Sequence, residues 1–181
     1  GKNMASYMDE KSNYKNYVTL YLPKDKLLSS AKVNLGYGDF SLKNTSFNTA
    51  DITLDDGDFI ADTITVNSGT ISLSYGDCDF KKASLSNTTI KSADGDISMN
   101  NLYLSEKVKL ALSYGDAVLT LNDSTKKTAG FDLITYYGTI NTSSLTGSHT
   151  EKDDEETFKS ESKDGKTILS INSEDGDITI Q

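Results

Sequence analysis

The stretch Asp56-Gly-Asp-Phe-Ile-Ala61 returns 19 residues later as Tyr75-Gly-Asp-Cys-Asp-Phe80 and again as Asp94-Gly-Asp-Ile-Ser-Met99. The same Gly-Asp step stands with its glycine at residues 38, 57, 76 and 95 and, after one extra residue, at 115. Looser copies follow at Gly138-Thr139 and at Gly176-Asp177. A fixed period of this size is typical of a stack of equivalent supersecondary units, so the repeat decides the fold.

Apolar residues fall into columns when the copies are aligned on the glycine. The columns stand five and three residues before it, and two, four, seven and nine residues after it. In the copy around Gly57 they are Ile52, Leu54, Phe59, Ala61, Ile64 and Val66. Paired positions are two residues apart, which is the period of a strand with one buried face, whereas the steps between pairs are odd.

These steps predict three short strands and three corners in each coil. The expected fold is therefore all-β: a single-domain parallel β-solenoid (β-helix-like) of ~19-residue triangular coils. Parallel crossovers strongly favour a right-handed winding. The glycine of the first corner is expected to take a positive φ, and Asn48, Asn67 and Asn87 at the third corner tolerate the left-handed conformation.

The ends of the sequence depart from the repeat. Residues 1–16 are polar and are expected to be a disordered leader or a remnant of an expression tag, so the solenoid domain is expected over 17–181. Residues 17–22 alternate and stop at Pro23, which predicts an N-terminal capping strand. The charged segment 151–166 is expected to be a loop, a degenerate coil or a hairpin that turns at Asp164-Gly165.

Composition excludes several classes of function. The formal net charge is −9, and all 18 basic residues are lysine, which argues against nucleic-acid binding and against docking to an anionic membrane surface. No apolar run is long enough to span a membrane. Cys78 is the single cysteine, so no intramolecular disulfide forms, and its inward column predicts a buried structural thiol.

The repeat units carry a family resemblance. The segment Leu20-Tyr-Leu-Pro-Lys24 precedes serial Gly-Asp-apolar-x-apolar units such as Gly38–Leu42, Gly95–Met99 and Gly176–Ile180. This pattern resembles the bacterial family of β-strand repeats labelled adhesins, a domain of unknown function, over roughly residues 17–181. The resemblance implies an extracytoplasmic envelope protein that is membrane-anchored or held at the cell surface through a segment outside this sequence. It carries no catalytic or binding residues.

Aspartate follows the glycine in most copies, which predicts a column of like charges. Neighbouring carboxylates about 5 Å apart repel by roughly 1 kcal/mol per pair in a water-like dielectric, so something must offset them. We favour hydrogen bonds from corner N–H groups. The alternative is bound Ca²⁺, although neither the β-roll nonapeptide nor the EF-hand pattern is present. The column comprises Asp39, Asp58, Asp77, Asp96, Asp116 and Asp177, and its first five members are the candidate calcium ligands.

The residue before the glycine alternates between tyrosine and aspartate. Aromatic rings pack on sugar faces and carboxylates accept hydroxyl hydrogen bonds, so these side chains are the candidate ligand face. The alternative is that they only shield a corner of the solenoid. The candidate residues are Tyr37, Asp56, Tyr75, Asp94, Tyr114 and Tyr137.

Catalysis is not expected. The single histidine, His149, lies in a polar segment, so neither a hydrolytic triad nor a zinc site can be assembled, and no other cofactor is implied. The sequence favours a non-enzymatic protein that binds or scaffolds through an outward face. Its partner would be a glycan or another envelope or surface protein, and it would be a monomer or a weak oligomer. The alternatives are a structural or oligomerising envelope rod and a glycan-active β-helix enzyme.

Overall fold

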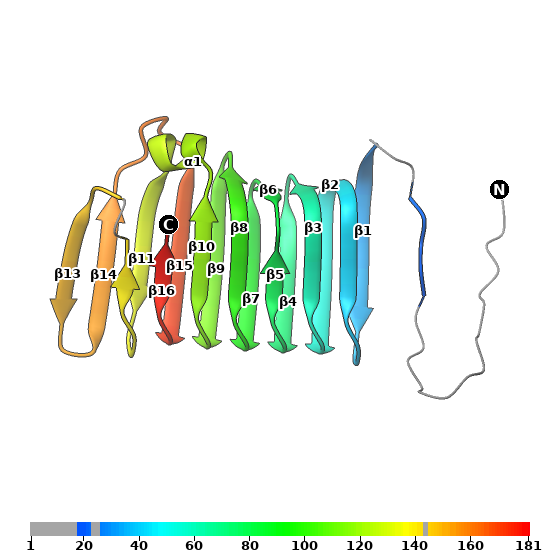
Figure 1. The fold of residues 1–181 in the computed structure, drawn as a ribbon, viewed down its shortest axis with the longest axis horizontal. Helices are drawn as coiled ribbons and strands as arrows, with labels where there is room; N and C mark the ends of the chain where they lie inside the picture. Colours follow the sequence, from blue (N-terminus) through cyan, green and yellow to red (C-terminus); the bar gives the residue numbers. More distant parts are fainter. Residues whose placement is uncertain (1–17, 23–25, 143–144) are drawn as a thin grey trace.

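The computed structural model describes residues 18–22, 26–142 and 145–181. The described chain is almost entirely β-structured, with 66 % of its residues in strands, and it winds into a parallel β-solenoid whose strands stack side by side along the long axis (Figure 1). The fold predicted from the 19-residue columns is therefore confirmed. The predicted leader over 1–16 lies outside the described residues.

The strands of each coil pair with their equivalents in the neighbouring coils. One sheet runs through β1 (Leu27–Leu35), the second half of β2 (Phe40–Asp56), β4 (Gly69–Tyr75), β7 (Thr88–Asp94), β9 (Lys107–Tyr114), β15 (Ile168–Asp175) and β11 (Gly130–Thr135). The facing strands are the first half of β2, β3 (Phe59–Val66), β5 (Cys78–Phe80), β6 (Ala83–Leu85), β8 (Ile97–Leu104), β10 (Ala117–Leu121), β16 (Ile178–Ile180) and β12 (Ile140–Asn141). The registers join residues 19 apart in the first coils, such as Ile52 with Ile71.

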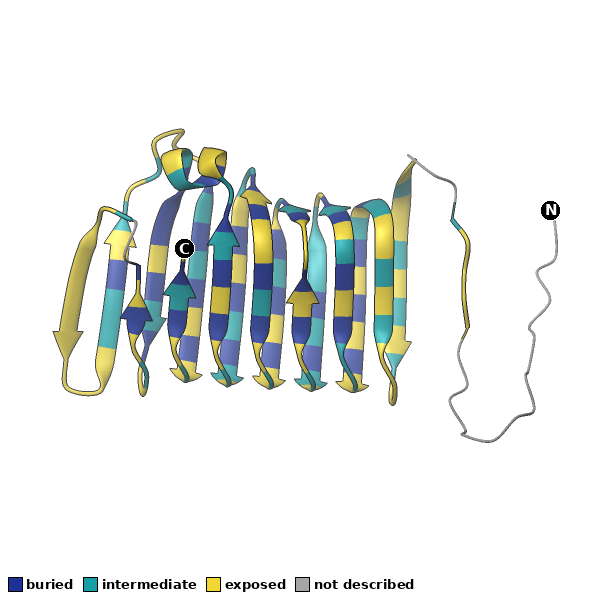
Figure 2. Cartoon of the chain, in the orientation of Figure 1, coloured by how far each residue is buried: buried dark blue, intermediate teal, exposed yellow. Residues whose placement is uncertain are grey.

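The predicted columns form the core. Ile52, Ile71, Ile90 and Leu110 lie above one another and are no more than 1 % exposed. Buried residues alternate with more exposed ones along most of the stacked strands (Figure 2), as expected when one face of a strand lines a narrow core. Each coil contributes only a few apolar side chains, so the core is continuous only because neighbouring coils stack.

Cys78 lies in this core between Phe59 and Ile97 of the neighbouring coils, as predicted. The ring of Phe59 packs against Phe40 and Phe80, with centroids 5.9 and 5.4 Å away. Burial, and then the nearby charges of Asp79 and Asp77, raise the pKa of the Cys78 thiol well above its usual value. The thiol is therefore a poor nucleophile.

The second and third corners differ from the prediction. The left-handed residues are Asn44, Thr63 and Asn101 at the second corner, together with Asn87 at the third. Asn48 and Asn67 do not adopt a positive φ; instead their side chains join neighbouring coils, with Asn67 Nδ2 donating to Asn48 Oδ1 (3.1 Å).

The C-terminal coil lies out of chain order. β15 pairs with β9 on one side and β11 on the other, and β16 lies between β10 and β12. The Gly176 copy is therefore not the last unit of the stack. It fills a place between the Gly115 and Gly138 copies, where the red strands lie among green and yellow ones in Figure 1.

Two connections make this insertion possible. A short helix, α1 (Asp123–Thr128), follows β10 and leads to β11, which leaves one coil position free between them. The helix is held on the stack by Thr125, whose Oγ1 accepts a hydrogen bond from Leu104 N. The returning loop before β15 is organised by Asp164. Its carboxylate accepts bonds from Ser162, Lys166 and Thr167, which hold its pKa well below the usual range.

The charged segment 151–166 is neither a degenerate coil nor simply a loop. It contributes to an antiparallel hairpin of β13 (Ser148–Lys152) and β14 (Glu155–Ser160) that turns at Asp153-Asp154, not at Asp164-Gly165. β14 pairs antiparallel with β11 and buries Phe158 opposite Leu133. The segment departs from the repeat because it closes the stack instead of extending it.

The predicted N-terminal capping strand is wrong for the residues that the structure describes. Val18, Leu20 and Tyr21 lie outside any strand and are at least 62 % exposed. Alternation in five residues shows only that they suit a strand, and a strand forms only where a sheet edge accepts its hydrogen bonds. Tyr17 and Pro23 lie outside the described residues.

Replacing Gly76 by valine should lower the free energy of unfolding by about 2–4 kcal/mol. Gly76 has φ +125°, and a Cβ there would lie closer than 3.0 Å to the carbonyl of Gly57. Gly36→Val is the matched control, because no atom lies within 4 Å of its Cβ position. Chemical unfolding of both variants makes the comparison. Equal stabilities would contradict the corner geometry.

Candidate functional site

The glycine corner brings the candidate residues of every coil to one edge of the solenoid. The glycine N–H donates to the neighbouring coil, as in Gly76 N to Asp94 O (3.1 Å), and the residue two later does the same, as in Cys78 N to Asp96 O (2.8 Å). These backbone bonds hold the residues before and after the glycine in register from coil to coil. The edge is therefore a rigid array rather than a loop.

The aspartates after the glycine form a hydrogen-bonded ladder. Oδ1 of each accepts the N–H of the equivalent residue in the next coil, at 2.8–3.1 Å. In spatial order the ladder runs through Asp39, Asp58, Asp77, Asp96, Asp116, Asp177 and Thr139. These are the corner bonds that the turn interpretation predicts.

The place of Thr139 in the ladder explains why this copy has threonine where the other copies have aspartate. Its N–H and its hydroxyl both donate to Asp177 Oδ1 (2.8 and 3.0 Å). Its coil is the last one in the stack, so no further N–H needs a carboxylate acceptor at this position. The loss of aspartate there follows from the spatial order and could not be explained from the chain order.

Binding of Ca²⁺ to the aspartate column stays a prediction. Within 18–22, 26–142 and 145–181, no three His, Cys, Asp or Glu side chains are grouped to hold a metal ion. Asp79 lies close to this column, and its pKa is raised by partial burial and then by the charges of Asp77, Asp58 and Asp96.

The residues before the glycine form what we call the tyrosine–aspartate stripe. Strand registers place Asp56 beside Tyr75, Tyr75 beside Asp94, Asp94 beside Tyr114, and Tyr114 beside Asp175. Gly138 packs on Gly176, so Tyr137 follows Asp175. The stripe therefore reads Tyr37, Asp56, Tyr75, Asp94, Tyr114, Asp175 and Tyr137, an unbroken alternation.

The structure thus brings all six predicted residues together and adds Asp175. In chain order Asp175 comes after Tyr137, so the sequence hides its place between Tyr114 and Tyr137. The four tyrosines are 60–86 % exposed. Within the described residues, the seven stripe side chains make no hydrogen bond or ion pair, so their polar groups are available to a ligand.

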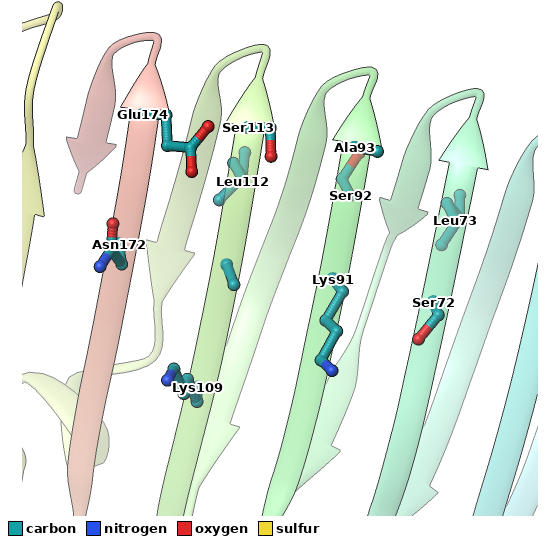
Figure 3. Close-up of a pocket in the computed structure, with 11 residues that line it drawn as sticks. Ser72, Leu73, Lys91, Ser92, Ala93, Lys109, Leu112, Ser113, Asn172 and Glu174 are labelled. Carbon is teal, nitrogen blue, oxygen red and sulfur yellow. The ribbon is translucent and has the colours of Figure 1, made fainter.

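A shallow hollow of about 440 Å³ borders the stripe on the outer face of β4, β7, β9 and β15 (Figure 3). Its lining includes the short side chains of Ala93 and Ala111 and the longer side chains of Lys91, Lys109 and Asn172. These are the strands that end at Tyr75, Asp94, Tyr114 and Asp175. The remaining lining residues are Ser72, Leu73, Ser92, Leu112, Ser113 and Glu174. The sequence does not reveal this hollow, because the residues that line it differ in type from copy to copy and form no repeated pattern.

A second hollow, of about 340 Å³, lies where the stripe ends at Tyr137. Tyr136 and Tyr137 line one part of it, and the turn of the β13–β14 hairpin, with Lys152 and Asp153–Glu155, lines the rest. Here the repeat is broken by a pair of adjacent tyrosines and by the charged turn. The edge as a whole therefore presents aromatic rings, carboxylates and two neighbouring hollows.

His149 lies on β13 and contacts Glu156 and the ring of Phe158. These contacts within the closing hairpin give His149 a structural role.

We expect added salt to stabilise this protein. The carboxylates of the ladder repel their neighbours, whereas the bonds to corner N–H groups are short-ranged and the Lys81, Lys159 and Lys166 ion pairs are exposed and weak. Each kcal/mol of repulsion that salt screens should raise the unfolding temperature by about 2–4 °C. Scanning calorimetry between low and high NaCl measures the shift, and a fall in unfolding temperature would contradict it.

The same measurement separates the two interpretations of the aspartate column. CaCl₂ and MgCl₂ at matched ionic strength should stabilise the protein equally if the aspartates serve only as corner acceptors. A further rise with Ca²⁺ alone, abolished by chelator, would instead establish bound calcium.

Comparison with known proteins identifies the family of this chain. Residues 2–181 match the family model described as Toastrack DUF4097, and the match does not itself carry the adhesin label. No curated protein and no solved structure matches the chain. Among the described residues, no helix is long and apolar enough to cross a membrane. Because the match spans almost the whole sequence, the chain belongs to the Toastrack DUF4097 family, a domain of unknown function with a β-solenoid fold.

Proposed function

We propose that this chain is a non-enzymatic binding module of a bacterial cell envelope that holds a polysaccharide along the tyrosine–aspartate stripe. The observation that carries the proposal is the alternation of exposed rings and carboxylates in space. The alternation survives at the far end only because the C-terminal coil is inserted between two earlier ones. A corner that merely needed shielding would not require this order.

The spacing suits an extended, linear ligand. Neighbouring coils lie about 4.8 Å apart, so a ring recurs about every 9.6 Å along the edge. In an extended polysaccharide whose successive sugars turn over, every second sugar presents the same face. Rings at every second coil can therefore pack on equivalent sugar faces, while the aspartates between them accept bonds from hydroxyl or amide groups.

Charge favours a neutral polysaccharide. Asp56, Asp94 and Asp175 add to the aspartate ladder beside them. Together these carboxylates outnumber Lys91 and Lys109 of the bordering hollow, so the edge repels anionic polymers. The bordering hollow offers Ser72, Ser113 and Asn172, whose side chains can bond neutral hydroxyl and amide groups. We therefore infer a ligand rich in hydroxyl or N-acetyl groups rather than in carboxylates or phosphates.

The adhesin-like role and the extracytoplasmic position belong to the same proposal. They are supported by the resemblance of the Gly-Asp units to envelope proteins and by a rigid, exposed edge that suits a surface ligand. The non-enzymatic role is supported by the environment of the Cys78 thiol, which is buried and has a raised pKa.

Binding of immobilised neutral polysaccharides, with acidic polysaccharides in parallel, tests the proposal. We expect saturable binding to a neutral polymer, and a loss of about tenfold in affinity (1.4 kcal/mol) for each of Tyr75→Ala and Tyr114→Ala. Tyr103→Ala is the matched control, since Tyr103 is also exposed but lies on β8, away from the stripe. Asp94→Asn should weaken binding less than the loss of a ring.

Two results would contradict this function. Binding that survives both tyrosine changes, or that falls equally in the Tyr103 control, would place the ligand elsewhere. No binding to any polysaccharide by the folded protein would leave a structural rod as the better account.

A further inference from the structure

We propose that two copies of this chain stack through their N-terminal ends to form a closed, head-to-head dimer. The dimer contact is separate from the polysaccharide site, because it lies at the end of the solenoid and not on the tyrosine–aspartate stripe.

The N-terminal end is an open pair of strand edges. Among the described residues, β1 pairs with β2 alone, which leaves one side of a nine-residue strand without a partner. In the facing sheet, the first half of β2 pairs with β3, and no other described strand lies on its outer side. Unpaired strand edges of this length are templates for the addition of another chain.

Apolar side chains at this end are incompletely covered. The equivalents one coil further in, such as Ile52, Leu54 and Phe59, are no more than 1 % exposed. The end coil packs against them with residues that are only partly buried, and Leu27 is 52 % exposed. The partly buried residues are Leu28, Ala31, Val33, Leu35, Phe40 and Leu42.

The opposite end is protected. The outer strand of the closing hairpin, β13, exposes all five of its residues, which are polar or charged, and the other edge strand, β12, has only two residues. Short and charged edges block further strand addition. One open and one blocked end predict an assembly that stops at two copies, since head-to-tail growth would need both ends open.

A second copy is the occupant that fits. A single extended peptide could continue one sheet, but the end presents two strand edges with an apolar strip between them. Covering all three at once requires another solenoid end with the same width, and the N-terminal end of a second copy has it. The only charged side chains in these edge strands are Lys32 and Lys43, both exposed, so pairing buries no charge.

Sedimentation velocity over a concentration series tests the dimer with the full chain. We expect a reversible monomer–dimer equilibrium with no larger species. Val33→Glu, which places a charge on the apolar strip, should shift the protein to monomer, whereas Thr150→Glu on β13 should leave the dimer intact. A wild-type protein that is monomeric throughout, or that grows beyond a dimer, would overturn the proposal.

Spin labels give a second measurement that does not depend on the folding of Val33→Glu. Cys78→Ala removes the native thiol, and single cysteines then replace Lys43 at the open end or Lys152 at the closed end. Nine strands stacked in one sheet at ~4.8 Å make each chain about 38 Å long. Labels at Lys43 should lie closer to each other than this length, and labels at Lys152 about 80 Å apart. The reverse pattern would overturn the head-to-head arrangement.

Discussion

Successive glycine corners approach each other closely, and the stacking of the coils rests on that approach. At Gly57, Gly76 and Gly95 a Cβ would fall closer than 3.0 Å to the carbonyl of the coil before, so only glycine allows the coils to meet. That approach lets the aspartate of one coil accept the N–H of the next, and the carboxylate ladder is therefore part of the corner. Hydrogen bonds to charged acceptors contribute about 1.5–3 kcal/mol, enough to outweigh screened repulsion between neighbouring carboxylates.

Function, in this account, follows from the order of coils in space. The residue before the glycine is the least constrained position of the corner, because it points away from the core and its neighbours fix only its backbone. Repetition then turns a single exposed residue into a linear array at the coil spacing. The insertion of β15 and β16 places Asp175 between Tyr114 and Tyr137 and completes that array. The same fold leaves one end open and closes the other with the charged hairpin, so binding and assembly use different surfaces.

The columns and the glycine corner could be predicted from the sequence because each coil repeats the same local solution to burial and turning. Which coils lie next to each other could not be predicted from the sequence. The column pattern shows that Ile171 and Ile178 belong to a coil, but it does not show which coils they contact. The closing hairpin was hidden because Phe158 is the one buried residue of β14, too little to establish a strand period. The strand expected at the N-terminal end is wrong for a different reason: residues 18–22 alternate in the sequence but pair with no strand among the residues that the structure describes.

If the stripe acts as one continuous binding edge, all of its rings meet a long ligand at once. An NMR titration with a long neutral polysaccharide can follow the ring signals of Tyr37, Tyr75, Tyr114, Tyr137 and Tyr103. We expect the four stripe rings to shift together with one apparent affinity while Tyr103 stays unchanged. Shifts confined to a single stripe ring, or equal shifts at Tyr103, would contradict it.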